Sequence, residues 1–139
     1  MSGIPPINQE KLAAIRAELG VHFSRILSYF AEDGVKSLDA VEEAVRNRDA
    51  VALVRPAHTL KGESLQFGAD ALGYTAERVE KAARTGVETH SFPLEIVDEA
   101  MRLRTLFEEA LAELQREAAP RPQAIPLRRA AGGFGRKVG

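Results

Sequence analysis

Apolar residues recur every three or four positions in each long segment of the chain, and this spacing limits the possible folds more than any other feature. A helix with 3.6 residues per turn gathers such positions on one face. No stretch alternates apolar and polar residues for long enough to indicate a strand. The sequence therefore predicts an all-α protein in which each helix buries one apolar stripe.

The first part of the chain predicts two helices. Asn8 is a suitable N-cap for a short helix over residues 9–19, and Gly20 is a natural stop. One apolar stripe then continues over residues 21–46. Gly34 is the weak point of this second helix, because a glycine inside a helix costs roughly 1 kcal/mol relative to alanine. The stripe keeps its phase across Gly34, so we predict a single long helix.

A third helix is predicted after Asp49, which is a suitable N-cap, and Gly68 ends it. Pro56 interrupts this segment, because proline lacks the N–H that a helix interior uses. Either the helix kinks there, or its first turn ends near Arg55. The apolar stripe of this helix is formed by Leu53, Ala57, Leu60, Ser64 and Phe67.

Two further stripes predict a fourth helix over residues 72–83, stopped by Thr85-Gly86, and a fifth over residues 97–114. The connections between the long helices are short, which favours antiparallel neighbours. We therefore predict an antiparallel up-and-down helical bundle with a four-helix core plus the short N-terminal helix.

Charge divides the chain into two parts. Residues 119–139 hold five of the 19 basic side chains and no acid, together with three prolines and four glycines. We expect one bundle domain over residues 1–118 and a flexible basic tail over residues 119–139. The domain keeps 14 basic and 20 acidic side chains. Because nucleic-acid binding needs a basic face, we expect no nucleic-acid partner for the domain.

Composition excludes several classes of site. The chain contains no Cys, which removes disulfides, thiol catalysis and Cys-based zinc sites. Its three His residues are scattered without an i, i+4 pair, so we expect no metal site. The first residues resemble no secretory signal, and no apolar stretch approaches the roughly 20 residues of a membrane span. We expect a cytoplasmic protein with no membrane partner.

The side chains best suited to a chemical reaction lie in the segment AHTLKGES at positions 57–64, on the predicted third helix. At 100° per residue, His58 lies roughly 120° from the centre of the apolar stripe, at the border with solvent. Lys61 and Gly62 follow at i+3 and i+4 on the same side. A free imidazole has a pKa of roughly 6.5, so at neutral pH one ring nitrogen keeps a lone pair. A nearby ammonium stabilises a phosphoryl group in transfer, and Gly62 leaves space for a bulky group.

These residues, with FGA at 67–69 and Leu72 following, resemble the histidine phosphotransfer (HPt) family of two-component phosphorelays over about residues 8–115. The resemblance implies that His58 accepts a phosphoryl group from the aspartyl phosphate of a receiver domain and passes it to another receiver. The matching Lys and Gly are Lys61 and Gly62. The implied partners are response-regulator receiver domains and a hybrid or separate histidine kinase. No cofactor is implied in this chain, and Mg²⁺ is expected in the partner receiver domain.

Four more residues are candidates for the surroundings of the phosphoryl group or of a docked partner. By spacing, Glu80 and Arg84 of the next helix face the histidine, where the family often has Gln at the first position. Glu80 departs from that pattern, and we expect it to pair with Lys61, or with Arg84 at i+4 in a plain surface ion pair. We place Ser64 and Leu65 in the same surroundings.

Three functional interpretations follow. We favour a monomeric phosphorelay intermediate that is not an enzyme. A second interpretation is a helical adaptor that binds receiver or kinase domains without being phosphorylated. A third, ranked last, is the dimerisation and phosphotransfer part of a histidine kinase, because the chain has no nucleotide-binding glycine motif. Phosphoryl transfer would be lost in His58→Gln, whereas adaptor binding would survive.

Overall fold

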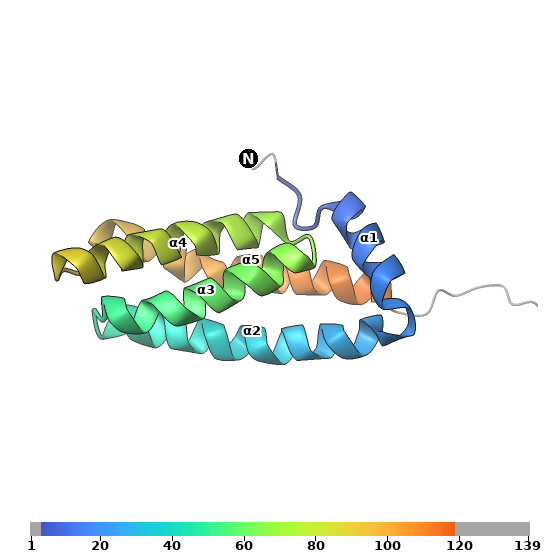
Figure 1. Ribbon diagram of the computed structural model, residues 1–139, viewed down its shortest axis with the longest axis horizontal. Helices are drawn as coiled ribbons and strands as arrows, with labels where there is room; N and C mark the ends of the chain where they lie inside the picture. Colours follow the sequence, from blue (N-terminus) through green and yellow to red (C-terminus); the bar gives the residue numbers. More distant parts are fainter. Residues whose placement is uncertain (1–3, 119–139) are drawn as a thin grey trace, which may run out of the picture.

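Five α-helices and two short 3₁₀ helices make up the computed structural model, which describes residues 4–118. Helices α2 to α5 pack as a four-helix bundle with successive helices antiparallel, and no strand occurs within the described residues (Figure 1). The predicted all-α bundle is therefore confirmed, while the predicted tail at 119–139 lies outside the described residues. The elements are α1 (Gln9–Leu19), η1 (Gly20–His22), α2 (Phe23–Arg46), α3 (Ala50–Gln66), α4 (Asp70–Thr89), η2 (Leu94–Ile96) and α5 (Val97–Ala118).

Side-chain caps begin two of the helices where the sequence predicts them. The side chain of Asn8 accepts hydrogen bonds from the backbone N–H groups of Glu10 and Lys11 at the start of α1. Asp49 accepts one from Ala52 at the start of α3. Each cap satisfies amide groups that have no partner inside the helix, so both helices begin at the predicted position.

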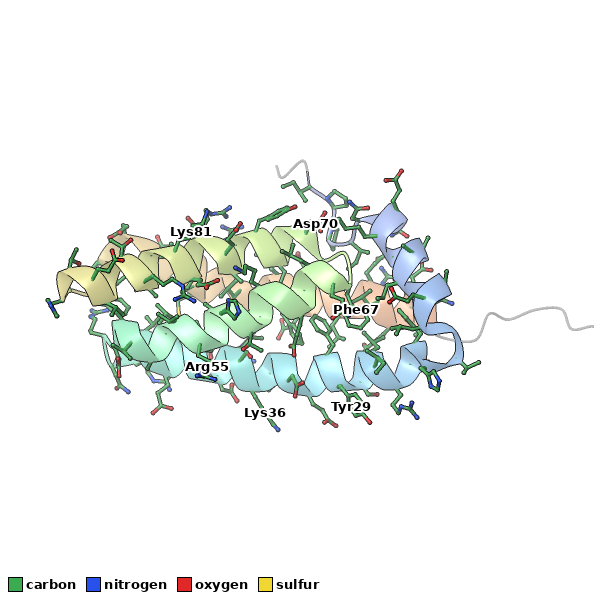
Figure 2. The ribbon with its side chains drawn as sticks, viewed as in Figure 1. Tyr29, Lys36, Arg55, Phe67, Asp70 and Lys81 are labelled. Carbon is green, nitrogen blue, oxygen red and sulfur yellow. The ribbon has the colours of Figure 1, made fainter. Side chains whose placement is uncertain are left out.

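The long helix α2 continues across Gly34 without a break, as predicted. Gly34 faces the ring of Phe107 on α5, and a Cβ atom at this position would overlap that ring. The glycine thus allows α2 and α5 to approach closely, which compensates for its low helix propensity. On the opposite face of α2, Tyr29 and Lys36 point away from the bundle (Figure 2).

The predicted end of the fourth helix is wrong. Helix α4 does not stop at Thr85-Gly86 but continues to Thr89, and His90 closes it with a left-handed backbone (φ 55°). Gly86 is needed there because the returning chain crosses it, so that an added Cβ would lie 2.5 Å from the carbonyl oxygen of Ser91. Helix α3 continues through Pro56, so of the two alternatives left open there, an end of the first turn near Arg55 does not occur.

The end of the bundle beside the α3–α4 turn is closed by α1 (Figure 1). The backbone N–H of Asn8 donates to the carbonyl of Gly68 at 2.7 Å, and Lys11 pairs with Asp70 at 3.0 Å. At the same end, Phe67 points into the interior (Figure 2) and its ring centroid lies 5.0 Å from that of Phe30. These contacts fix the turn between α3 and α4, and therefore the register in which the two helices face one another.

Candidate functional site

His58 lies on the side of α3 that faces α4, at the edge of the core. Its neighbours Ala57 and Leu60 are buried, whereas 58% of the His58 side chain is exposed. The prediction that the imidazole is displayed at the border with solvent is confirmed. The helical period accounts for this, since Ala57 and Leu60 lie on the buried stripe and His58 falls between that stripe and solvent.

The imidazole is held from α4 by Glu80. The Nδ1 atom of His58 lies 3.0 Å from Oε2 of Glu80, which also accepts hydrogen bonds from Nε and Nη2 of Arg84 at 2.9 and 2.7 Å. The other carboxylate oxygen, Oε1, lies 2.9 Å from Nζ of Lys61 and forms an ion pair with it. Glu80 therefore meets both cations proposed as its partners, and the histidine as well.

Glu80 is buried, with only 6% of its side chain exposed, so the prediction of a plain surface ion pair is wrong. Burial by itself would raise the pKa of this carboxyl, but the hydrogen-bonding groups of Lys61, Arg84 and His58 outweigh burial and bring the pKa to about 2. Glu80 is thus ionised at neutral pH. The close approach of α3 and α4 buries it, and helix periodicity alone does not specify that approach.

The charge state of Glu80 determines which ring nitrogen of His58 carries a proton. An ionised carboxylate only accepts hydrogen bonds, so the hydrogen between the two groups belongs to Nδ1 of His58. In the neutral ring, Nε2 is then the nitrogen with the free lone pair. No described residue hydrogen bonds to Nε2. A nucleophilic nitrogen is therefore available on the exposed side of the ring.

The remaining predicted site residues divide into two groups. Lys61 is partly exposed, and Gly62 is on the surface, where an added Cβ would meet nothing within 4 Å. Ser64 is instead fully buried, and Leu65 is half-buried and packs against Gly73 of α4. Ser64 is therefore part of the core and cannot touch a docked partner, in contrast to its predicted place around the phosphoryl group.

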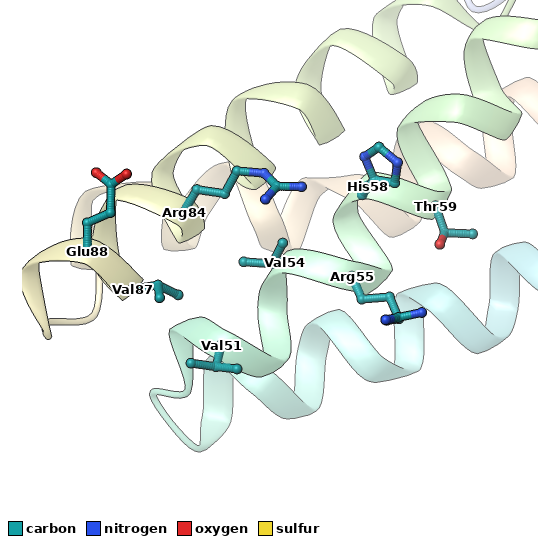
Figure 3. A pocket seen from close by; sticks show the side chains of 8 residues that line it. All are labelled: Val51, Val54, Arg55, His58, Thr59, Arg84, Val87 and Glu88. Carbon is teal, nitrogen blue, oxygen red and sulfur yellow. The ribbon is translucent and has the colours of Figure 1, made fainter.

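A shallow groove of about 770 Å³ extends from His58 along α3 and α4, and sequence reasoning missed it (Figure 3). Val51 and Val54 of α3 and Val87 of α4 supply its apolar side chains. Arg84 reaches from α4 toward His58 at one end. The available sequence signal was the valines themselves, because Val51 and Val54 lie seven and four residues before His58 on one helix face. The other lining residues are Arg55, Thr59 and Glu88.

Two further properties of the described residues bear on function. Across residues 4–118, no helix is both long and apolar enough to cross a membrane. In the same part of the chain, no group of three or more His, Asp or Glu side chains is arranged to hold a metal ion.

Comparison with known proteins agrees with this geometry. The family model described as Hpt domain matches residues 25–117, which include the whole site. The fold is similar to the crystal structure of histidine-containing phosphotransfer protein B (HptB) from Pseudomonas aeruginosa PAO1, with a TM-score of 0.72 and 23% identity, covering 84% of this chain and 96% of that chain. No curated protein sequence gives a significant match. The chain therefore belongs to the Hpt domain family and is a phosphotransfer protein of phosphorelay signalling, not a catalytic kinase.

Proposed function

We propose that His58 accepts a phosphoryl group from the aspartyl phosphate of one receiver domain and passes it to the aspartate of another. The observation that supports this most strongly is the state of the ring. Nδ1 is held as a donor by Glu80 at 3.0 Å, so Nε2 of an exposed imidazole keeps its lone pair. In the neutral ring the attacking nitrogen carries no proton, so the nucleophile needs no general base.

The two cations beside the ring suit the charge that develops in the transfer. The phosphoryl group passes through a loose transition state with negative charge on its equatorial oxygens. Lys61 and Arg84 are both bound to Glu80, and both are partly or largely exposed. Either side chain can turn toward a phosphoryl oxygen by changing its outer rotamers, since neither is enclosed in the core.

Docking of the receiver is proposed on the surface around His58. The groove offers the apolar side chains of Val51, Val54 and Val87, and Gly62 leaves the opposite side of the histidine without a side chain. Leu65 packs against Gly73 and adds little to this surface. The magnesium ion that an aspartyl phosphate needs would come with the receiver, since the acidic pocket belongs to that partner.

The test is to incubate the protein with labelled phospho-receiver domains from the same organism and follow acid-labile, alkali-stable label on this chain. We expect label on the wild type and none on His58→Gln. The matched control is His22→Gln, because His22 is an exposed histidine outside the site. If receivers bind without ever labelling His58, the protein is a non-phosphorylated adaptor and the proposal is wrong.

A further inference from the structure

The group that holds Nδ1 of His58 is a carboxylate, and this has a chemical consequence for the phosphorylated ring. A neutral amide in the same place could either accept a hydrogen bond from Nδ1 or turn and donate one to it. A carboxylate can only accept while it is ionised. Glu80 is held ionised by Lys61 at 2.9 Å and by Arg84 at 2.7 Å, so its contact with the ring requires a proton on Nδ1.

Phosphorylation of Nε2 changes how readily the ring loses its Nδ1 proton. When the Nε2–P bond forms and the O–P bond of the aspartyl phosphate breaks, the proton on Nδ1 stays in place and the ring becomes a phosphoimidazolium. In water such a ring loses its Nδ1 proton more readily than an unmodified N–H, because the ring now carries positive charge. An ionised acceptor at 3.0 Å opposes this loss, since the hydrogen bond to a charged partner exists only while the proton remains.

We propose that Glu80 is a positioning residue that keeps the Nδ1 proton on phosphorylated His58 and thereby makes the phosphoryl group easy to release. This inference rests on the proposed function, since it concerns the phosphorylated form of the same histidine. On release the P–N bond breaks, its electron pair returns to Nε2, and phosphorus bonds to a carboxylate oxygen of the receiver or to water. With Nδ1 protonated, the leaving group is neutral imidazole. Without that proton, the leaving group is an imidazolate anion, which is a far poorer one.

The charged groups around the ring favour this role. On α3, Arg55 and Lys61 lie three residues before and three residues after His58, and on α4, Arg84 and Glu88 line the groove. The phosphoryl oxygens would attract Lys61 and Arg84. Even if one of these cations turns toward the phosphoryl group, the other and the positively charged ring keep Glu80 ionised. The hold on the Nδ1 proton would therefore persist in the phosphorylated state.

The direct test is nitrogen NMR of ¹⁵N-histidine-labelled protein phosphorylated with phosphoramidate, which needs no receiver. We expect phosphorylation on Nε2, with Nδ1 losing its proton at a pH roughly one to two units higher than in free phosphohistidine. In Glu80→Gln this difference should disappear. Glu77→Gln is the matched control, because Glu77 lies one turn earlier on α4 and pairs only loosely with Lys81 at 4.0 Å. The wild-type measurement stands even if Glu80→Gln fails to fold.

A second measurement follows release. Phospho-His58 in Glu80→Gln should hydrolyse roughly tenfold more slowly than in the wild type at a pH where only the wild-type ring keeps its proton, and Glu77→Gln should match the wild type. Deprotonation of the wild-type ring at the pH of free phosphohistidine, phosphorylation on Nδ1, or failure to phosphorylate His58 would each overturn the inference. If the ring behaves as expected but no receiver exchanges phosphoryl groups with it, the inference stands and the proposed relay fails. If receivers exchange phosphoryl groups with His58 but the ring does not hold its proton, the proposed relay stands and the inference fails.

Discussion

Two ionic clusters connect neighbouring helices of this bundle, and they have opposite charges at their centres. In the first, the buried acid Glu80 of α4 is surrounded by His58, Lys61 and Arg84. In the second, the basic Arg104 of α5 donates to Asp39 and Glu42 of α2 at 2.7 to 3.0 Å. Both clusters combine one central charge with two opposite charges.

The clusters differ in whether the residues around the central charge are available for a reaction. The hydrogen bond to Glu42 is the largest of the effects that raise the pKa of Arg104, which is charged in water in any case, so the second cluster has no chemical state to change. The first includes an exposed ring with a free nitrogen beside a groove. The same kind of contact therefore connects helices in one place and orients an exposed imidazole in the other.

The largest expected effect concerns the stability that Glu80 contributes. Its pKa falls from an ordinary 4.5 to about 2 on folding, so its contribution is complete above about pH 4.5 and is lost as the pH falls through 2. We expect the difference in unfolding free energy between wild type and Glu80→Gln to shrink by about 3 kcal/mol from neutral pH to about pH 2. Urea unfolding across this range measures it. A difference that is independent of pH would contradict the ionised, buried state of Glu80.

The next effect separates the clusters by function. Lys61→Met removes a cation that lies 2.9 Å from Glu80 near the reacting ring, and we expect phosphoryl transfer to His58 to slow about tenfold. Transfer rates from a labelled receiver measure this. Lys81→Met is the control, because Lys81 is an exposed lysine whose ion-pair partner among the described residues, Glu77, lies 4.0 Å away. Equal rates in the two variants would remove Lys61 from the site.

A smaller effect is expected from the second cluster. Arg104→Met removes a partly exposed base from between two carboxylates, and we expect a loss of about 1 kcal/mol in the free energy of unfolding. Phosphoryl transfer should be unchanged, because α2 and α5 contribute nothing to the groove. Slower transfer in Arg104→Met would mean that the two clusters are coupled through the bundle.

The smallest expected effect is at the open side of His58. Gly62→Ala should raise the free energy of unfolding by roughly 0.5–1 kcal/mol, since the new methyl group meets nothing within 4 Å and alanine favours the helix. Gly73→Ala should do the opposite, because its Cβ would lie 2.5 Å from Leu65 Cδ2. Thermal or urea unfolding of both variants tests whether the surface beside the histidine is as open as described.

Most of the fold could be predicted because apolar periodicity and caps act locally. Asn8 and Asp49 each satisfy backbone groups a few residues away, so the starts of α1 and α3 are visible in the sequence. The end of α4 was not visible in the same way. Gly86 is a glycine because the chain beyond the helix returns across it, and a contact of this kind cannot be distinguished from a stop signal in the sequence alone.

The site was predictable to a similar extent. The exposure of His58 follows from its angle on one helix, whereas its proposed role comes from the resemblance. The burial of Glu80 depends on how closely α3 and α4 approach, which the small residues Gly73 and Ala76 of α4 permit and a single-helix projection does not contain. Ser64 was placed near a partner although its own position on the apolar stripe indicated burial.

The extra turn of α4 beyond Gly86 also sets a distance. It adds Val87 opposite Val51, and Val51 lies seven residues before His58, or about 10 Å along the axis of α3. A partner that seats an apolar side chain between the two valines must therefore carry its reactive carboxylate about two helical turns away. Had α4 stopped at Gly86, the histidine would be equally exposed, but Val87 would no longer face Val51. The protein would then have one contact fewer with which to discriminate between receivers of different shape.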